Sequence, residues 1–361
     1  MKLTIPPHIL SLKPYEPGKP LEEVEREYGI KDSIKLASNE NPLGPSPLAL
    51  KAIREATMSL NRYPDGSGHI LLSKLSQKLN IAAENIVLGN GSDEIIALLA
   101  LVLLQPGDQV IIPKPTFLLY DNIVRSVGAT PVYVPLNELS IDLDAVLKNI
   151  SPECRMIFLC NPNNPTGTVF SASDFERFLQ AVPSDVVIVV DEAYIEFVRN
   201  PNCANSLEFI SRNAALVTLR TFSKAYGLAG LRIGYGLMSQ TLAELLNRVR
   251  LPFNLNSLAL AGAAAALDDD AFLEKTIRLV HEGLDFMYES LNRRGIEYFP
   301  TQSNFFLIDV KKDAQEVFQR MLSEGVIVRS MKAYSFTNYI RVTVGLENEN
   351  ERFLKTLEKV L

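Results

Sequence analysis

The residue with the clearest chemical potential is Lys224, in the segment T-F-S-K-A-Y-G at 221–227. An amine attacks a carbonyl carbon only when it is neutral, and enzymes favour that form by burying a lysine or placing positive charge beside it. The hydroxyls of Thr221 and Ser223 precede the lysine, and Arg232 follows it in G-L-R-I-G. These three side chains are suited to bind a phosphate beside the amine. The alternative is a lysine that is simply solvated in a polar loop.

A second candidate is Asp191, which follows the apolar run V-V-I-V-V at 186–190 and begins the segment D-E-A-Y. A carboxylate at the end of such a strand is expected to be partly buried, and burial raises its pKa unless a cation compensates. The protonated nitrogen of a bound pyridine ring is one such cation. For a lone aspartate, an N-cap or a structural ion pair is the alternative interpretation.

Two further polar segments follow predicted strands. The segment G-N-G-S-D-E at 89–94 precedes an apolar helical pattern, and glycines beside a helix N-terminus let backbone N–H groups bind an anion. The segment N-P-N-N-P-T-G at 161–167 places amide side chains where they can donate to a ligand oxygen. Taken singly, each also fits a plain turn, with Ser92 or Asp93 as an N-cap in the first and two prolines stiffening the second.

The elements that must position these segments are short buried strands that alternate with helices. Apolar runs predict strands at 85–88, 109–112, 130–134, 156–160, 186–190 and 215–219. Helical patterns lie between most of them, at 93–104, 120–127 and 171–181. This alternation predicts an α/β fold with a mostly parallel sheet covered on both faces. Ligands bind at the carboxyl ends of the strands in such sheets, which is where the four polar segments lie.

The chain is long enough for about two domains. Prolines 6, 7, 14, 17 and 20 predict an irregular N-terminal arm at 1–30, with a short helix at 21–28, that packs against the small domain or a partner subunit. Residues 31–250 form the predicted large domain. From 251 to 361 the pattern predicts a smaller α+β domain, with helices at 257–267, 270–293, 314–323 and 348–360 and strands at 305–310, 326–329 and 339–344.

Composition narrows the classes of partner. The 361 residues carry a net charge of −6, which argues against nucleic acid or an anionic membrane bound by bulk charge. The three cysteines form no C-x-x-C pair, so we expect a reducing compartment and no metal. The N-terminus lacks the apolar run of a signal peptide, and the longest apolar run, 95–104, is about half a membrane span. A cytoplasmic protein is expected.

Together and in this order, the four segments resemble those of the fold-type I enzymes that use pyridoxal 5′-phosphate, in particular the class I/II aminotransferases. The resemblance runs from about 38 to 345. It implies that Lys224 forms a Schiff base with the cofactor and then carries the substrate proton, and that Asp191 pairs with the pyridine nitrogen. It implies that Tyr194 and Asn164 hydrogen-bond the phenolic oxygen of the ring. The phosphate site would comprise Gly91, Ser92, Asp93, Thr221, Ser223 and Arg232.

Two aromatic residues gain a role only through this resemblance. Phe117, in P-K-P-T-F, matches the aromatic residue that stacks on the cofactor ring, and is otherwise a core phenylalanine. Tyr63, in N-R-Y-P-D-G, matches a tyrosine that reaches the cofactor phosphate of the partner subunit, and is otherwise a turn residue. The match implies a homodimer with shared active sites. The implied reaction is ping-pong transfer of an amino group from a small donor to a 2-oxo acid.

Three segments are similar to the histidinol-phosphate aminotransferases of histidine biosynthesis: Y-E-P-G-K-P at 15–20, L-A-S-N-E-N-P-L-G at 36–44 and G-V-I-V-R at 325–329. The similarity implies L-histidinol phosphate as the donor and 2-oxoglutarate as the acceptor. A phosphate-bearing amine without a carboxylate needs more than one cationic or hydroxyl partner. The residues expected to bind this substrate are Tyr15, Asn41, Arg329 and Arg341.

Other substrates stay open, because related enzymes share nearly all of these motifs. The alternatives are an aromatic or broad-range aminotransferase and a decarboxylase resembling those that act on threonine phosphate. Phe117 stands where tyrosine is frequent in the histidinol-phosphate family, and Leu43 where many members have an aromatic residue. A transcription regulator would need a DNA-binding domain in addition. A non-catalytic binding protein would be expected to lack Lys224 or Asp191, and both are present.

Overall fold

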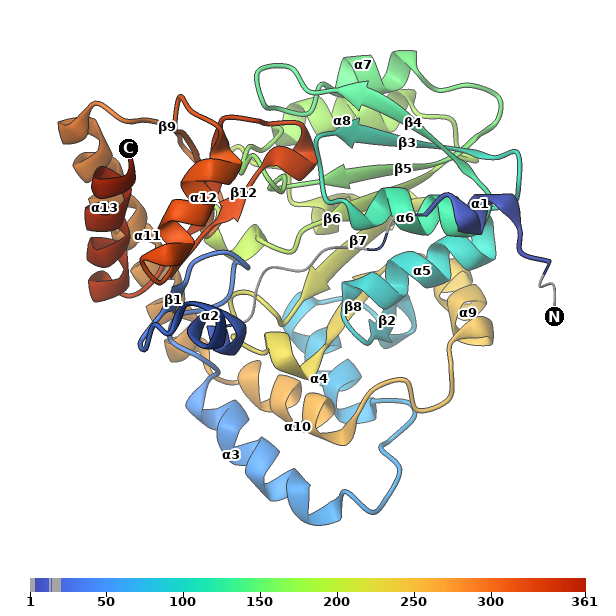
Figure 1. The fold of residues 1–361 in the computed structure, drawn as a ribbon. Helices are drawn as coiled ribbons and strands as arrows, with labels where there is room; N and C mark the ends of the chain where they lie inside the picture. The colour runs from blue at the N-terminus through green and yellow to red at the C-terminus, as the bar shows by residue number, and fades with distance from the viewer. Residues whose placement is uncertain (1–3, 13, 15–20) are drawn as a thin grey trace.

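The computed structural model describes residues 4–12, 14 and 21–361 (Figure 1). Within these residues, a seven-stranded sheet of order β2-β8-β7-β6-β5-β3-β4 forms the centre of the molecule. Its neighbours pair in parallel except β8, which runs antiparallel to β2 and β7. The predicted mostly parallel sheet is therefore confirmed. The strands are β2 (Ile86–Gly89), β3 (Gln109–Lys114), β4 (Thr130–Pro135), β5 (Cys154–Cys160), β6 (Val187–Asp191), β7 (Leu216–Thr221) and β8 (Gly234–Leu237).

Helices bury both faces of this sheet. Side chains alternate along each strand, so Val110 packs toward α5 (Ser92–Leu103), α6 (Leu119–Ser126) and α9 (Gln240–Val249), while Ile111 packs toward the opposite face. That opposite face is covered by four helices, α7 (Leu143–Lys148), α8 (Ala172–Ala181), α4 (His69–Leu79) and α10 (Ser257–Ala266). Helix α3 (Pro47–Ala56) packs on α10. The polar ends of the strands are left to form the site.

The C-terminal part of the chain builds a second sheet beside the first, at the left of Figure 1. Among the described residues its order is β12-β13-β10-β9, with all neighbours antiparallel. Its strands are β9 (Glu297–Phe299), β10 (Phe305–Asp309), β12 (Arg329–Ser330) and β13 (Tyr339–Thr343). The accompanying helices are α11 (Asp270–Arg294), α12 (Ala314–Ser323) and α13 (Glu347–Val360). Helix α11 begins where Asp269 caps the Phe272 N–H and ends at Gly295, whose φ of 65° is left-handed.

The N-terminal segment contacts both parts of the molecule. Helix α1 (Pro7–Leu10) lies against α6 (Figure 1), whereas Leu21, at the start of α2 (Leu21–Tyr28), packs near the second sheet. The expectation that prolines keep the first twenty residues irregular is wrong at α1. Proline is tolerated in the first turn of a helix because the N–H that it lacks would be unpaired there in any case.

Most predicted elements are observed within two residues of their predicted ends, but the strand at 326–329 is not. The segment divides into β11 (Val326–Ile327), which pairs with β1 (Ile34–Lys35), and β12, which pairs with β13. The reason is tertiary, because the two halves meet different partner strands. Helices α3, α4, α7 and α9 were not predicted. Short 3₁₀ turns lie at 57–59, 83–85, 195–197, 206–212, 229–231 and 332–334.

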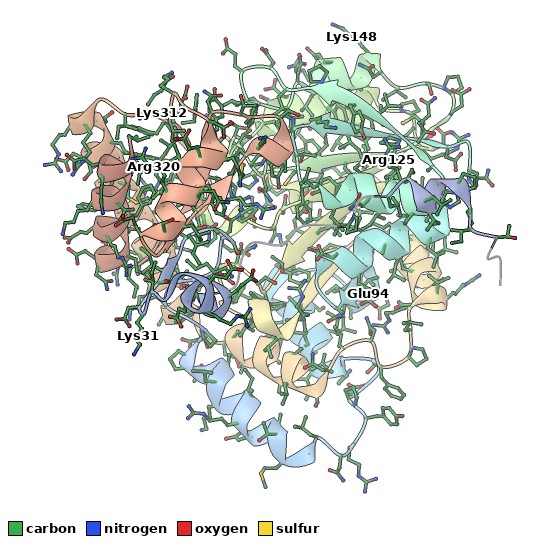
Figure 2. All side chains as sticks on the ribbon, in the orientation of Figure 1. Lys31, Glu94, Arg125, Lys148, Lys312 and Arg320 are labelled. Carbon is green, nitrogen blue, oxygen red and sulfur yellow. The ribbon has the colours of Figure 1, made fainter. Side chains whose placement is uncertain are left out.

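Charged side chains cover the outside of the molecule, as Lys31, Lys148 and Lys312 illustrate in Figure 2. No helix of the described ranges is long and apolar enough to cross a membrane.

Substitution of Gly227 tests how tightly the loop that carries Lys224 is packed. Its φ is +69°, and a Cβ there would lie 2.1 Å from the carbonyl oxygen of Gly44. We expect Gly227→Ala to lower the free energy of unfolding by more than about 2 kcal/mol, since a left-handed alanine alone costs ~1–2 kcal/mol. Gly230→Ala is the matched control, because a Cβ at Gly230 meets nothing within 4 Å. Equal urea midpoints for the two variants would contradict this packing.

Candidate active site

A cavity of about 400 Å³ lies where the carboxyl ends of β5, β6 and β7 face the N-terminus of α5 and strands β12 and β13. The structure brings thirteen of the predicted site residues together in its wall. These are Gly91, Ser92, Asp93, Phe117, Asn164, Asp191, Tyr194, Thr221, Ser223, Lys224, Arg232, Arg329 and Arg341. Segments more than 200 residues apart in the sequence thus meet in one cavity.

Lys224 projects into this cavity from the loop after β7. Its Nζ donates to the Ser38 carbonyl oxygen at 3.3 Å and lies 5.6 Å from the centre of the Tyr194 ring. Burial lowers the pKa of Lys224 to about 8, and the positive charge of Arg341 lowers it further, against the opposing effect of Glu40. Roughly a tenth of the amine is therefore neutral at pH 7 and about half at pH 8, and the neutral form is what nucleophilic attack requires.

Asp191 ends β6 and is buried. Its Oδ2 accepts a hydrogen bond of 2.7 Å from the Tyr120 hydroxyl, and its Oδ1 accepts one of 3.2 Å from the Ala193 N–H. Burial raises the pKa of Asp191 to about 6, while the bond from Tyr120 acts to lower it. A cation that enters the cavity would therefore stabilise the ionised carboxylate.

Tyr120 is a site residue that the sequence analysis missed. Its ring stacks on Phe158 at 4.6 Å and meets Phe117 edge-to-face at 5.5 Å, which fixes the hydroxyl beside Asp191. A tyrosine on the apolar face of a predicted helix was the available indication, because a buried tyrosine hydroxyl needs a hydrogen-bond partner. Tyr120 lies behind the cavity wall, and the wall residues that were not predicted are Ala37, Ser38, Asn39, Glu40, Cys160, Ala193, Ala229, Gly230 and Tyr334.

One end of the cavity is suited to an anion. Backbone N–H groups at the start of α5, the hydroxyls of Thr221 and Ser223 and the guanidinium of Arg232 all face it. Arg232 also pairs with Asp93 at 3.3 Å. Partial burial raises the pKa of Asp93, and Arg232 opposes that shift. A Cβ at Gly91 would lie 2.9 Å from the Arg232 guanidinium, so glycine keeps this cradle open.

The opposite wall carries Asn164 and Arg341. Both are buried, and Arg341 donates to the Asn164 Oδ1 and, at 2.8 Å, to the Ala37 carbonyl oxygen. Because a guanidinium only donates, the Asn164 amide NH₂ is left to donate elsewhere. The Nε of Arg341 is buried and has no hydrogen-bond partner in the described part of the chain. The positive charge of Arg341 in the cavity wall suits an anionic ligand.

Two predicted residues are not brought to the cavity. Tyr63 is 82% exposed and stacks on Phe253 at 4.7 Å, away from the cavity wall. The Asn41 amide donates to the Ala225 carbonyl oxygen and the Thr276 hydroxyl, at 3.0 and 3.1 Å, and lines a neighbouring hollow. Asn41 therefore holds the loop after Lys224 in place in this structure. Tyr15 lies outside the described residues.

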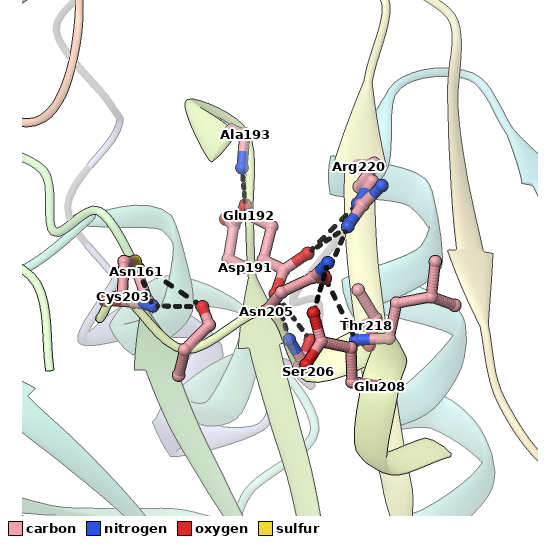
Figure 3. A network of polar contacts seen from close by, with 12 residues as sticks. Asn161, Asp191, Glu192, Ala193, Cys203, Asn205, Ser206, Glu208, Thr218 and Arg220 are labelled. Carbon is pink, nitrogen blue, oxygen red and sulfur yellow. Dashed lines mark hydrogen bonds and ion pairs between the residues drawn. The ribbon is translucent and has the colours of Figure 1, made fainter. Parts of the chain in front are cut away.

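Behind the cavity, a buried polar network supports the ends of β6 and β7 (Figure 3). Glu192 points to the opposite face of the sheet from Asp191 and accepts from Arg220 at 2.8 and 3.0 Å. Its second oxygen accepts from the backbone N–H and the hydroxyl of Ser206, at 2.6 and 2.7 Å. A buried ion pair with satisfied oxygens resists displacement, because removing either partner would leave an unpaired buried charge.

Comparison with known proteins identifies the class to which this fold and site belong. The model of the family "Aminotransferase class I and II" matches residues 31–357. The chain belongs to this family of pyridoxal 5′-phosphate-dependent enzymes. Its curated relatives include the histidinol-phosphate aminotransferases of Moorella thermoacetica, 45% identical over 98% of this chain and 92% of that protein, and of Desulfotalea psychrophila, 46% identical over 100% and 96%. The expected resemblance to histidinol-phosphate aminotransferases is confirmed.

A solved structure extends the comparison to three dimensions. The histidinol-phosphate aminotransferase from Sinorhizobium meliloti, in complex with pyridoxal-5′-phosphate, superposes with a TM-score of 0.91 at 28% identity, covering 99% of this chain and 97% of that one. The fold-type I architecture is thereby confirmed.

The cavity of this chain fits the family cofactor. A buried carboxylate, Asp191, lines the cavity and would suit a protonated ring nitrogen, and the cradle beside Gly91 would suit a phosphate. The amine of Lys224 opens onto the same space. Both charged groups of the cofactor would thus meet complementary groups.

The burial of Asp191 predicts a pH effect in the cofactor-free protein. The folded-state pKa of about 6 lies above the reference value of 3.8, so stability that is present below pH 4 is lost as the pH rises through 6. We expect wild type to lose about 3 kcal/mol relative to Asp191→Asn between pH 4 and 7, at ~1.4 kcal/mol per pKa unit. Urea unfolding at several pH values measures this. Asp185→Asn, at an exposed carboxylate, is the control; parallel curves for wild type and Asp191→Asn would contradict the prediction.

Proposed function

We propose that this chain transfers the amino group of L-histidinol phosphate to 2-oxoglutarate, a step of histidine biosynthesis. The observation that carries the proposal is the pairing of Arg329 with Arg341. The two residues lie directly opposite each other on β12 and β13, and both line the cavity. Two arginines side by side in a cavity wall present positive charge and several N–H donors to an anionic ligand. A phosphate on the substrate would supply two negative charges, and the names of the curated relatives support the same substrate.

The cofactor, Lys224 and Asp191 would then have separate roles in the reaction. The cofactor, when bound, supplies an electron sink for the charge that develops at the substrate Cα. Lys224, whose lowered pKa makes its neutral form accessible, would take the proton from that carbon and deliver it to the C4′ carbon of the cofactor. Asp191 holds a proton on the ring nitrogen by stabilising its positive charge.

Orientation comes from the remaining cavity residues. Ser92, Thr221, Ser223 and Arg232, which line the cavity, would bind the cofactor phosphate, and Phe117 would stack on the ring. Asn164 and Tyr194, in the same wall, would hydrogen-bond the phenolic oxygen of the ring. Arg329 and Arg341 grip the substrate phosphate, and in the second half-reaction they hold a carboxylate of the 2-oxo acid. Fixing both ends of the substrate places its Cα near Lys224.

The substrate is tested by recording the visible spectrum of the purified holoenzyme. L-Histidinol phosphate, L-phenylalanine, L-aspartate and O-phospho-L-threonine are added in separate cuvettes. Conversion of the cofactor to its amine form by histidinol phosphate, far faster than by the others, supports the proposal. A faster response to phenylalanine would assign an aromatic aminotransferase instead. Release of carbon dioxide from phosphothreonine would assign a decarboxylase.

In the half-reaction with the amino donor, Arg329 should act only on the phosphate of the substrate. We expect Arg329→Met to lower kcat/KM for L-histidinol phosphate by about 10- to 100-fold, the size of a lost hydrogen bond to a charged group. Activity toward L-histidinol, which has no phosphate, should change little. Arg320→Met, at an exposed arginine of α12, is the matched control. Equal losses of kcat/KM for the two substrates would show that Arg329 does not bind the phosphate.

We further propose that the enzyme is a cytoplasmic homodimer with shared active sites. The three cysteines have free thiols, which suits a reducing compartment. Exposed apolar side chains gather along α3, the turn that follows it and the loop before α10, and such surfaces mark interfaces between proteins. They include Leu48, Leu50, Met58, Leu60, Tyr63, Leu251 and Phe253. In a dimer the partner subunit would cover this surface. Tyr63 would then lie at the interface, where it could reach the active site of the partner.

Disruption of that surface provides the test of the dimer. Light scattering should give twice the 40.1 kDa of one chain for the wild type. Met58 is 85% exposed, so Met58→Glu would be harmless in a monomer but would bury a charge in a dimer. We expect this variant to dissociate into monomers at a higher protein concentration than wild type does. Lys148→Glu, on the exposed surface of α7, should dimerise normally; a monomeric wild type would refute the proposal.

A further inference from the structure

A short chain of buried side chains ends at the Tyr194 hydroxyl. It consists of Thr343 on β13, Asn39 in the segment before α3, and Tyr194 just after β6. Their side chains are buried, and Asn39 and Tyr194 line the cavity. Three segments that are distant in the sequence therefore meet at the hydroxyl proposed to contact the cofactor ring.

The hydrogen bonds of this chain have a fixed direction. The backbone N–H of Asn39, which can only donate, donates to the Thr343 Oγ1 at 3.0 Å. The Thr343 hydroxyl in turn donates to the Asn39 Oδ1 at 3.1 Å. The Asn39 Nδ2 is then left to donate to the Tyr194 oxygen at 2.8 Å. Since that oxygen accepts from Asn39, its own proton points elsewhere.

The opposite orientation of the Asn39 amide is less favourable. It would turn Oδ1 toward Tyr194 and draw the phenol proton away from the cavity. The Thr343 hydroxyl would then lose its acceptor, and a buried polar group without a partner is costly. The polarity of the whole chain thus follows from the need of the Thr343 hydroxyl for an acceptor.

Two further features hold this arrangement in place. Asn39 has a φ of 57°, a left-handed conformation that asparagine tolerates better than most residues, and Asn304 donates to its carbonyl oxygen at 3.1 Å. The Tyr194 ring meets Phe305 edge-to-face at 5.0 Å. Burial raises the pKa of Tyr194 well above its ordinary value, although Arg341 opposes the shift, so the hydroxyl keeps its proton at neutral pH.

We propose that Thr343 and Asn39 are positioning residues that fix the Tyr194 hydroxyl as a hydrogen-bond donor into the cofactor cavity. The inference rests on the proposed contact between Tyr194 and the phenolic oxygen of the cofactor. A donor stabilises that oxygen in its anionic form, so the relay lowers the pH at which the bound cofactor loses its proton. The pH at which the bound cofactor loses its proton then also depends on β13, a strand of the second sheet.

The test is a spectrophotometric pH titration of the bound cofactor in four holoenzymes: wild type, Tyr194→Phe, Thr343→Val and the double variant. Valine keeps the shape of threonine and removes only its hydroxyl. We expect Tyr194→Phe to raise the midpoint by about one to two pH units, the size of a lost bond to a charged group. Thr343→Val should raise it by at least half as much. The double variant should equal Tyr194→Phe, because both changes act through one hydroxyl.

Thr343→Ser is the matched control, since it keeps the hydroxyl and should keep the wild-type midpoint. Tyr288→Phe is a second control, because it removes a hydroxyl remote from the cavity, one that accepts from the Thr301 N–H, and it should leave the midpoint unchanged. A shift with Tyr194→Phe but none with Thr343→Val would overturn the relay. No shift with Tyr194→Phe would instead overturn the proposed contact of Tyr194 with the cofactor.

Discussion

The burial of the Asp191 carboxylate at the end of β6 is the constraint on which the site depends. An apolar strand carries this charge into a cavity, where burial raises its pKa to about 6. The hydroxyl of Tyr120 and the N–H of Ala193 hold its two oxygens without neutralising them. A nearby cation would therefore stabilise the ionised carboxylate, and a protonated ring nitrogen would be such a cation.

The same cavity contains groups of both charges. Asp191 and the α5 N-terminus with Arg232 all line it, so it offers partners to a ligand that carries both a positive and a negative group. Between them, the pKa of Lys224 is lowered to about 8 by burial and then by Arg341. An arginine that can grip the substrate thus also helps to keep the reacting amine neutral.

The second sheet contributes residues to the cavity wall and to the contacts behind it. Strand β13 carries Arg341, and its last residue, Thr343, begins the hydrogen-bond chain to Tyr194. On the other side, the buried Glu192–Arg220 pair anchors β6 and β7 from behind (Figure 3). The strand ends are therefore held from both faces, which limits the movement of Asp191 and Thr221.

The sequence by itself determined the alternation of strands and helices, and the polar segments that follow the strands, because apolar periodicity and turn residues are local properties. It also indicated most of the cavity wall, since parallel strands bring their carboxyl ends to one edge. Only the tertiary structure decided that Tyr120 binds Asp191, that 326–329 divides between two sheets and that Asn41 faces Ala225. These outcomes depend on which distant segments come into contact, and no local pattern encodes such contacts.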